Sequence, residues 1–275
     1  MPPTLSIIGP GRVGKTIGRV LASAGIVSLL DILARSPEKG ADASRFIGAG
    51  HAISQWQALR SADVYLLAVP DDQIDAACKA LVASLCLRPG AVVFHCSGAL
   101  TCAVLAAARD SGAAVASVHP VRSFADPAKV AADFAGTSCG VEGDVTALSI
   151  LVPLFDAVGA RMIGIEAAHK TLYHAAAVFA SNYLVTLVDV AIQSYGQAGI
   201  APEAALQMIA PLLRETADNA LRLGPAAALT GPVARGDWQT VAHQQQALAA
   251  WNPGYARLYA QLAEATAALA ARDEP

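Results

Sequence analysis

A glycine-rich turn near the start of the chain constrains the fold more than any other feature of the sequence. Residues 5–8 form an apolar run as long as a short buried strand, and apolar residues recur at helical spacing from Val13 onward. Between them, Gly9, Gly11 and Gly14 form the pattern G-x-G-x-x-G. A strand, this turn and a helix in succession predict the first unit of a dinucleotide-binding domain.

Each glycine of this pattern has a mechanical role in such a domain. The first permits the tight turn that leaves the strand, the second lets the backbone approach a pyrophosphate, and the third lets the helix pack against the sheet. The free amides and positive dipole end of the helix then face the phosphates. Because glycine-rich turns are common, the alternative is a plain strand–turn–helix corner. The predicted cofactor-binding residues of the turn are Gly9, Pro10, Gly11, Arg12, Val13 and Gly14.

The residues that follow the second predicted strand, at residues 27–34, indicate which dinucleotide would bind. An acidic residue at this point binds the 2′-hydroxyl of NAD, but this chain has Arg35 and Ser36, with Lys39 a little later. A guanidinium and a hydroxyl suit a 2′-phosphate. Asp31 is the competing acid, but it falls inside the strand. NADP is therefore favoured over NAD as the cofactor, the alternative being that Arg35 and Lys39 are only solvated loop charges.

Strands and helices alternate through the first part of the chain. Further strands are predicted at residues 46–53, 63–69, 91–95, 113–118, 137–141 and 161–165. This alternation predicts an α/β fold with a doubly wound parallel sheet, whose ligands bind where the carboxyl ends of the strands converge. Val69, Pro70 and Ser97 lie at that edge and would border the ribose and nicotinamide of the cofactor. His119 lies there too and is a candidate substrate residue.

The strand pattern stops after residue 165, and the remainder is predicted to be helical. The expected helices cover residues 166–195, a segment that opens at Pro202 and is split or kinked at Pro211, residues 238–250, and a last segment that ends near residue 271. Asp237 is placed to cap the third of these helices. We therefore expect two domains, a Rossmann-like domain at residues 1–165 and an all-α substrate and dimerisation domain at residues 166–275.

The start of the long helix is the best candidate for a catalytic surface that closes over the nicotinamide. The polar side chains expected on one face of this apolar helix are Glu166, Lys170, His174 and Ser181. A lysine and a histidine in such surroundings are costly unless they are paired or used. Lys170 could donate to a carbonyl oxygen as hydride reaches its carbon, and His174 could exchange the proton. The alternatives are a Glu166–Lys170 surface pair and, for His174, a half-buried structural imidazole.

Two positions in the helical half are further candidate substrate residues. Arg235 lies in a loop at residues 230–237 that contains glycine and proline, and its guanidinium offers a fork for a carboxylate. The alternative is a loop that only leads into a helix, with Arg235 paired to Asp237. Asn182, within the long helix, is assigned to the substrate together with His119 and Arg235. The sequence does not group ligands at metal-binding spacing, so no metal site is expected.

Composition limits the class of protein further. The 275-residue chain is 55% hydrophobic and 15% charged with a formal net charge of -3, so a large core is expected and nucleic-acid binding is not. Five cysteines without a C-x-x-C pair fit a reducing cytosol, and no leader is expected. The most lipid-like stretch, residues 175–192, carries polar residues, so a buried helix is expected rather than a membrane span. These features predict a cytoplasmic protein.

The chain resembles the superfamily of 6-phosphogluconate-dehydrogenase-like proteins, which includes pyrroline-5-carboxylate reductases, β-hydroxyacid dehydrogenases and ketopantoate reductases. In the amino-terminal half the resemblance rests on residues 9–14, 35–36 and 68–70. Three later motifs, at residues 119–120, 170–182 and 229–237, are similar to one subfamily. That subfamily joins a Rossmann-like domain to a carboxyl-terminal helical domain of unassigned function.

The resemblance implies a nicotinamide-binding fold, an NADP-linked oxidoreductase and a homodimer built through the helical domains. In β-hydroxyacid dehydrogenases and ketopantoate reductases an asparagine follows the catalytic lysine by four residues. Lys170 matches that lysine, but His174 replaces the asparagine, so the substrate does not carry over. The hypothesis is an NADP-dependent oxidoreductase acting on a small polar, carboxylate-bearing molecule. The alternatives are an NADP(H)-binding sensor or structural protein without turnover and, on His119-Pro120 alone, a prephenate-dehydrogenase-like enzyme.

Overall fold

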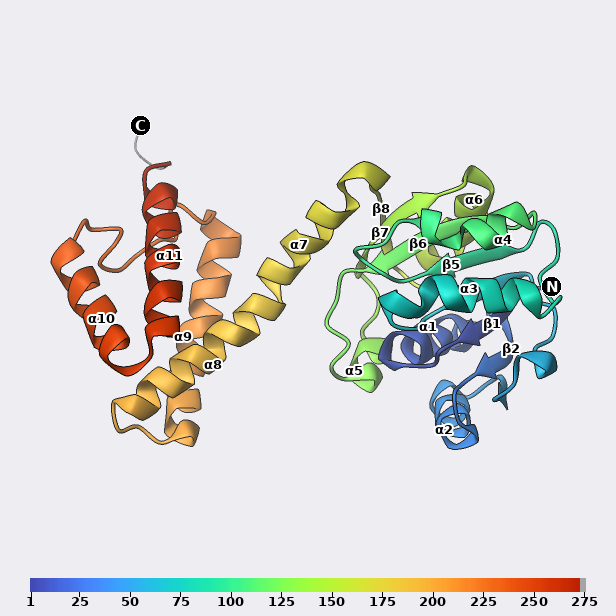
Figure 1. Ribbon diagram of the computed structural model, residues 1–275, viewed down its shortest axis with the longest axis horizontal. Coiled ribbons are helices and arrows are strands. Elements are labelled where there is room, and N and C mark those ends of the chain that lie inside the picture. The colour runs from blue at the N-terminus through green and yellow to red at the C-terminus, as the bar shows by residue number, and fades with distance from the viewer. Residues whose placement is uncertain (273–275) are drawn as a thin grey trace. The chain divides into compact units, whose positions relative to one another are not determined.

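The structure, a computed structural model, describes residues 1–272 and divides into two compact units (Figure 1). The first unit comprises Met1–Ser181 and the second begins at Asn182. The division therefore lies beyond the boundary expected after residue 165. The helix α7 (Lys170–Ala180) belongs to the first unit because its first residue, Lys170, is buried against strands of that unit.

The first unit is built on one eight-stranded sheet with the order β3-β2-β1-β4-β5-β6-β7-β8. Its strands are β1 (Thr4–Ile8), β2 (Ser28–Leu33), β3 (His51–Ile53), β4 (Val64–Leu67), β5 (Val92–His95), β6 (Ala114–Pro120), β7 (Ser138–Gly143) and β8 (Arg161–Gly164). Strands β1 to β6 are parallel to one another. The predicted α/β fold with a doubly wound sheet is thus confirmed for the part of the chain that forms these six strands.

The sheet departs from the parallel arrangement at β7, which runs antiparallel to β6, while β8 is parallel to β7. The connection between β6 and β7 contains the helix α5 (Pro127–Ala132), and it does not return the chain to the opposite edge of the sheet. The chain therefore re-enters the sheet from the edge at which β6 ends, and the amide of Val121 already donates to the carbonyl of Ser138.

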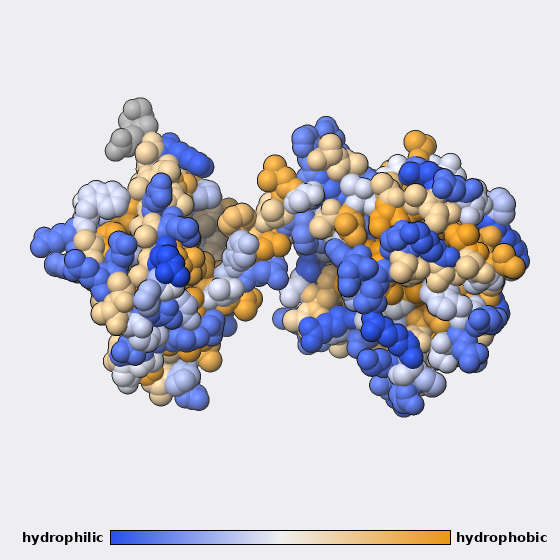
Figure 2. All heavy atoms as spheres, viewed as in Figure 1, coloured by the Kyte–Doolittle hydropathy of each residue, from blue (hydrophilic) through white to orange (hydrophobic). Residues whose placement is uncertain are grey.

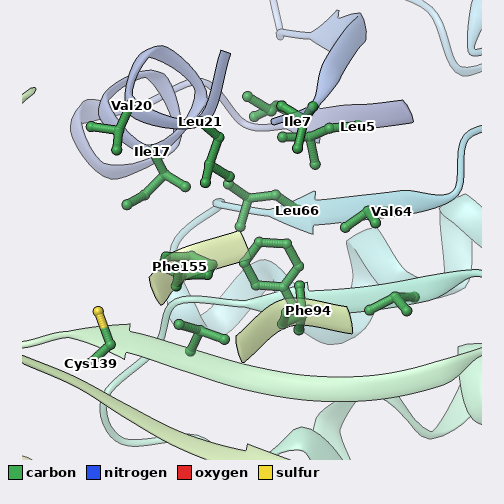
Figure 3. Packing of buried hydrophobic residues seen from close by; sticks show 14 of the residues in the cluster. Leu5, Ile7, Ile17, Val20, Leu21, Val64, Leu66, Phe94, Cys139 and Phe155 are labelled. Atoms are coloured by element: carbon green, nitrogen blue, oxygen red, sulfur yellow. The ribbon is translucent and has the colours of Figure 1, made fainter. Parts of the chain in front are cut away.

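Helices cover both faces of this sheet. The helices of the first unit are α1 (Arg12–Ser23), α2 (Pro37–Ile47), α3 (Ile74–Ala83), α4 (Ala106–Asp110), α5, α6 (Val145–Asp156) and α7. Alternate residues of the central strands pack into two separate cores: in β4, Leu66 packs against the side of α1 and α6, and Tyr65 against the side of α3 and α4. Figure 3 shows the first core, where Phe94 of β5 meets Phe155 of α6 edge to face at 6.1 Å between ring centres. This double coverage explains why the strand sequences are continuously apolar.

The glycine turn has the geometry that its sequence predicts. Gly9 has a φ of +83°, and a Cβ atom there would lie 2.6 Å from Val69 Cγ1. A Cβ atom at Gly14 would lie 2.8 Å from the Cβ atom of Ala68, so this glycine lets α1 pack closely against the sheet. Gly11 differs from both, because a Cβ atom there would meet only the Ala68 carbonyl oxygen, at 4.0 Å. The backbone at Gly11 therefore faces open space at the start of α1.

The described part of the second unit contains helices and no strand, as predicted. These helices are α8 (Asn182–Gln197), α9 (Pro202–Leu223), α10 (Trp238–Trp251) and α11 (Pro253–Ala270). Pro202 opens α9 and Asp237 caps α10, its Oδ1 accepting from the Thr240 amide at 3.1 Å. The expected split at Pro211 is wrong, because α9 continues through this residue. Helix α8 packs on α9, and α10 packs on α11.

The apolar stretch at residues 175–192 belongs to two helices and not to the one long helix expected, because α7 ends at Ala180 and α8 begins at Asn182. The expectation that this stretch is buried is also wrong. None of the residues of α8 is buried, and Leu184, Val185 and Leu187 are exposed. The helical stretch Ala167–Gln197, with a mean hydropathy of 1.7, is long and apolar enough to cross a membrane; one such helix is weak support for a span, because core helices pass the same test. Figure 2 shows hydrophobic side chains at the surface of both units.

Candidate functional site

A cavity of about 580 Å³ opens in the first unit at the carboxyl ends of β1, β2 and β4. This is the sheet edge at which doubly wound folds bind ligands. The residues that line it are Ile8, Gly9, Pro10, Gly11, Leu33, Ala34, Arg35, Lys39, Ser54, Trp56, Ala68, Val69, Pro70, Gln73, Ala76, Ala77 and Ala80. The glycine turn and the start of α1 thus form one wall, the end of β2 a second, and the segment from β4 into α3 a third.

Six of the predicted cofactor residues line this cavity, namely Gly9, Pro10, Gly11, Arg35, Val69 and Pro70. The other five, Arg12, Val13, Gly14, Ser36 and Ser97, lie outside its walls in the described structure. Gly14 is buried beneath the turn, where it packs on Ala68. Ser36 is the N-cap of α2, and its hydroxyl accepts from the amide of Lys39 at 3.4 Å.

The corner of the cavity beside the end of β2 carries positive charge. Arg35 and Lys39 line it, and Arg35 Nη2 donates to Gln73 Oε1 at 2.6 Å. Asp31, the competing acid, is completely buried inside β2 and accepts from Arg60 Nη2 at 2.7 Å and from the Arg60 amide at 2.7 Å. None of the residues that line the cavity is acidic. Arg60 therefore compensates the charge of Asp31, and neither residue lines the cavity.

The side chains of the cavity wall that were not singled out from the sequence include Trp56 and Gln73. Trp56 lies in the 3-10 turn η1 (Trp56–Ala58) after β3, and Gln73 ends the 3-10 turn η2 (Asp71–Gln73) after β4. Both follow strands whose carboxyl ends the sequence places at the binding edge. A turn directly after such a strand is a sequence signal for cavity-lining residues. The signal does not identify which residue of the turn lines the cavity.

Lys170 lies in a second polar cluster, in the interior of the first unit. Its side chain is only 1% exposed, and Nζ donates to Glu142 Oε1 at 2.9 Å and contacts Ser117 Oγ. Glu142 Oε1 also accepts from the amide of Cys102 at 2.8 Å. Burial lowers the pKa of Lys170 against the opposing effect of Glu142. Burial alone would raise the pKa of Glu142, but the hydrogen bonds from Lys170 and Cys102 lower it overall.

The expectation that Glu166 lies on the same helix face as Lys170 is wrong. Helix α7 begins at Lys170, and residues 167–169 form a 3-10 turn, so Glu166 precedes the helix. Glu166 lies 3.4 Å from His169 Nε2 at the surface, where both side chains are exposed. The alternative of a Glu166–Lys170 surface pair is contradicted as well, because Lys170 bonds to Glu142 in the interior.

Two histidines meet above the loop that follows β5. His119, near the end of β6, approaches Tyr173 and His174 of α7, and its Nδ1 lies 2.9 Å from the Tyr173 hydroxyl. The rings of His119 and His174 are edge to face with centres 5.5 Å apart. A Cβ atom at Gly98 would lie 2.8 Å from His119 Nε2 and would overlap His174 Nδ1. The two imidazoles therefore close on the backbone at Gly98, where any side chain would displace both rings.

The surroundings of His119 favour a neutral ring. Burial, with the adjacent His174 and Lys170, lowers the pKa of His119 to about 4. The Nδ1 atom of His174 is buried and has no hydrogen-bond partner among residues 1–272. A polar atom buried in this way costs free energy unless another molecule satisfies it. The arrangement fits a group that exchanges a proton with a ligand.

Ser97 connects the loops after β4 and β5. Its hydroxyl donates to Asp71 Oδ2 at 2.7 Å and accepts from the amides of Ala99 and Leu100. Asp71 lies in η2, and its carboxylate accepts this hydrogen bond from Ser97. The Ser97 amide donates to Nδ1 of the buried His95, whose pKa burial and Lys170 lower to about 4. Within the described chain, the hydroxyl of Ser97 is thus fully engaged.

The remaining predicted substrate residues lie in the second unit. Asn182 begins α8, and Arg235 lies in the loop before α10, as predicted. The alternative Arg235–Asp237 pair does not form in the described structure, where Asp237 bonds to the amide and hydroxyl of Thr240. The assignment of both residues to the substrate stays a prediction.

Comparisons with known proteins identify both halves of the chain. Residues 2–120 match the family model described as Rossmann-like domain, and residues 137–266 match the model described as Domain of unknown function (DUF2520). A search of curated proteins found no significant match.

Several solved structures share the fold over nearly the whole chain. A protein from Thermotoga maritima is 28% identical with a TM-score of 0.75, covering 98% of this chain and 99% of its own. A Bacteroides fragilis protein, provisionally named an NADP oxidoreductase, is 18% identical with a TM-score of 0.81 and coverages of 97% and 98%. A pyrroline carboxylate reductase from Plasmodium falciparum, solved with NADP bound, is 13% identical with a TM-score of 0.60 and coverages of 98% and 98%. Residues 2–120 are therefore similar to Rossmann-like domains, and residues 137–266 are similar to DUF2520 domains.

Proposed function

We propose that this protein is an NADP-dependent oxidoreductase that transfers hydride to or from a small polar, carboxylate-bearing substrate. The observation that carries the proposal is the cavity at the glycine turn, with Arg35 and Lys39 at one corner and no acidic side chain in its walls. Similar folds named as NADP oxidoreductase or solved with NADP bound support it.

The residues of the cavity fit the parts of NADP. The open backbone at Gly11 and the start of α1 would receive the pyrophosphate. Arg35 and Lys39 would hold the 2′-phosphate, since a guanidinium and an ammonium both bind phosphate. Trp56 and the alanines of α3 offer apolar contact for the adenine. When bound, the cofactor would supply or accept the hydride.

His119 and His174 would move the proton that accompanies hydride transfer. Reduction of a carbonyl or imine requires a proton donor, and the reverse reaction requires a base. Tyr173 fixes the His119 ring through Nδ1, so that Nε2 is the atom at which this residue would hold or release a proton. His174 Nδ1, buried without a partner among the described residues, is the second such atom.

In this proposal Lys170 does not donate a proton to the substrate. Its Nζ is engaged by Glu142 and Ser117, and its side chain is almost fully buried. A lysine in this state would act as a positioning residue that fixes the start of α7, and with it Tyr173 and His174. Asn182 and Arg235 remain the proposed substrate residues, with Arg235 suited to a carboxylate.

Turnover separates an enzyme from a protein that only binds the cofactor. Purified protein should bind NADPH and oxidise it with at least one member of a panel of small keto acids and cyclic imines, or reduce NADP+ with at least one member of a panel of small hydroxy acids. His119→Asn should retain NADPH binding and lose about 100-fold or more in turnover, the usual contribution of a general acid or base. Tight NADPH binding without turnover on the panel would favour the NADP(H)-binding sensor.

We also propose that the protein forms a homodimer through its helical unit. Exposed apolar side chains on α8 and α9 include Leu184, Leu187, Leu206 and Leu212. Apolar side chains that are exposed together on one surface usually mark an interface. Light scattering after size-exclusion chromatography should give twice the chain mass. Leu212→Arg should shift the protein toward monomer, whereas Val145→Arg, at an exposed position of the first unit, should not.

A further inference from the structure

We propose that Gln73 is a specificity-determining residue that selects NADPH over NADH by holding the guanidinium of Arg35 in the cavity. The inference rests on the proposed function, because it requires NADP(H) to bind in this cavity. Gln73 is neutral, and the charge that would recognise the phosphate belongs to Arg35.

The bond between these two side chains joins separate loops. Arg35 follows β2 and Gln73 ends the turn after β4, and these strands flank β1 in the sheet. Both side chains line the cavity, and Arg35 Nη2 lies 2.6 Å from Gln73 Oε1. The Gln73 backbone is itself held, since its amide donates to the carbonyl of Pro70 at 2.8 Å. A fixed backbone thus presents the acceptor to an otherwise exposed arginine.

Gln73 suits this role because its amide is neutral. An exposed arginine loses considerable rotamer entropy when a ligand orders it, and an existing hydrogen bond reduces that loss. A neutral acceptor orders the guanidinium and leaves its charge intact, whereas a carboxylate would neutralise it. One guanidinium N–H bonds to Gln73, so others remain to form a fork with phosphate oxygens.

The surroundings leave Arg35 available to an anion. The nearest acid on β2, Asp31, is bonded to Arg60, and the cavity lining contains Lys39 as a second cation. NADH has no 2′-phosphate, so it gains nothing from an ordered Arg35. The opposite possibility is that the Arg35–Gln73 bond competes with the phosphate, in which case removing Gln73 would tighten NADPH binding.

The test is a fluorescence titration of NADPH and NADH with the full chain and four variants. Gln73→Ala should weaken NADPH binding about threefold to tenfold, the effect of one hydrogen bond, and leave NADH binding within about twofold. Gln73→Glu should weaken NADPH binding by at least about tenfold, because the new carboxylate pairs with Arg35. Arg35→Ala should lose most of the preference for NADPH. Arg35→Ala/Gln73→Ala should bind NADPH no more weakly than Arg35→Ala, because Gln73 acts through Arg35.

A matched control is Gln57→Ala, at an exposed position of η1 that does not line the cavity, which should bind both nucleotides like the wild type. Circular dichroism and melting temperature would show that each variant folds. Unchanged or tighter NADPH binding by Gln73→Ala would overturn the inference and leave the proposed function intact. A wild type that binds neither nucleotide would overturn both. A wild type that binds NADPH without turnover, with Gln73 variants behaving as described, would overturn only the proposed oxidoreductase activity.

Discussion

The ammonium of Lys170 lies 2.9 Å from the carboxylate of Glu142, and the two side chains are only 1% and 7% exposed. This buried ion pair joins the first residue of α7 to the antiparallel strand β7. The orientation of β7 determines that Glu142 lies beside Ser117 of β6, its partner in register. The pair therefore fixes the helix that carries Tyr173 and His174 over the sheet edge.

Loss of one member of this pair should destabilise the first unit strongly. Lys170→Met should reduce the free energy of unfolding by about 3–5 kcal/mol, because it leaves Glu142 buried without its counter-charge. The measurement is urea denaturation. The matched control is Lys79→Met, whose ion pair with Asp75 is 64% and 54% exposed and should be worth less than about 1 kcal/mol. Equal losses in the two variants would contradict the structural role of Lys170.

The lowered pKa values of His95 and His119 should make the stability of the protein depend on pH below about 6.5. Burial lowers the pKa of His95 and of His119 from 6.5 to about 4 in the folded protein. The unfolded chain then binds more protons between these values, so stability is complete above about pH 6.5 and falls as the pH decreases toward 4. Melting temperature against pH should show this decline, and His119→Phe should make it less steep than in the wild type. An identical decline of melting temperature in His119→Phe would refute the lowered pKa of His119.

The close approach at Gly98 predicts a variant that damages the proton-transfer site and spares the cofactor cavity. In Gly98→Ala, the new methyl group would overlap His174 Nδ1 and approach His119 Nε2 to 2.8 Å, so both rings must move. Turnover should fall about tenfold or more, since misplaced catalytic groups lose rate steeply, while NADPH affinity stays constant. Gly196→Ala, in α8 with open space around it, is the control and should keep full activity. Full activity of Gly98→Ala would exclude the two imidazoles from the reaction.

Tyr173→Phe tests whether His119 needs its hydrogen bond. The variant removes the partner of His119 Nδ1 and preserves the ring contact, whose centres are 5.6 Å apart. The pH profile of turnover should shift and the maximal rate should fall severalfold, with the affinity for NADPH unchanged. An unaltered profile would mean that Tyr173 only packs against the histidine.

Local patterns in the sequence predicted much of the fold and part of the site. The apolar strands, the G-x-G-x-x-G turn, Arg35 and the Asp237 cap each depend on residues close together in the chain, and they are where the sequence placed them. The antiparallel direction of β7 was missed, because an apolar run carries no signal for strand direction.

The parts of the site that the sequence did not predict depend on contacts between distant segments. Lys170 was placed with Glu166 by helical spacing, whereas its partner Glu142 lies on a strand that precedes α6. The contact of Gln73 with Arg35 joins two loops across β1 and follows from the order of the strands. Gly98 gave no sign of its role, because its neighbours are two histidines far along the chain.

The most direct measurement is the binding of NADPH and NADH to the wild type and to Arg35→Asp, followed by nucleotide fluorescence. A 2′-phosphate held by Arg35 and Lys39 predicts that the wild type binds NADPH at least about tenfold more tightly than NADH, and that Arg35→Asp loses or reverses this preference. Equal affinities of the wild type for the two nucleotides, unchanged by the substitution, would contradict the account.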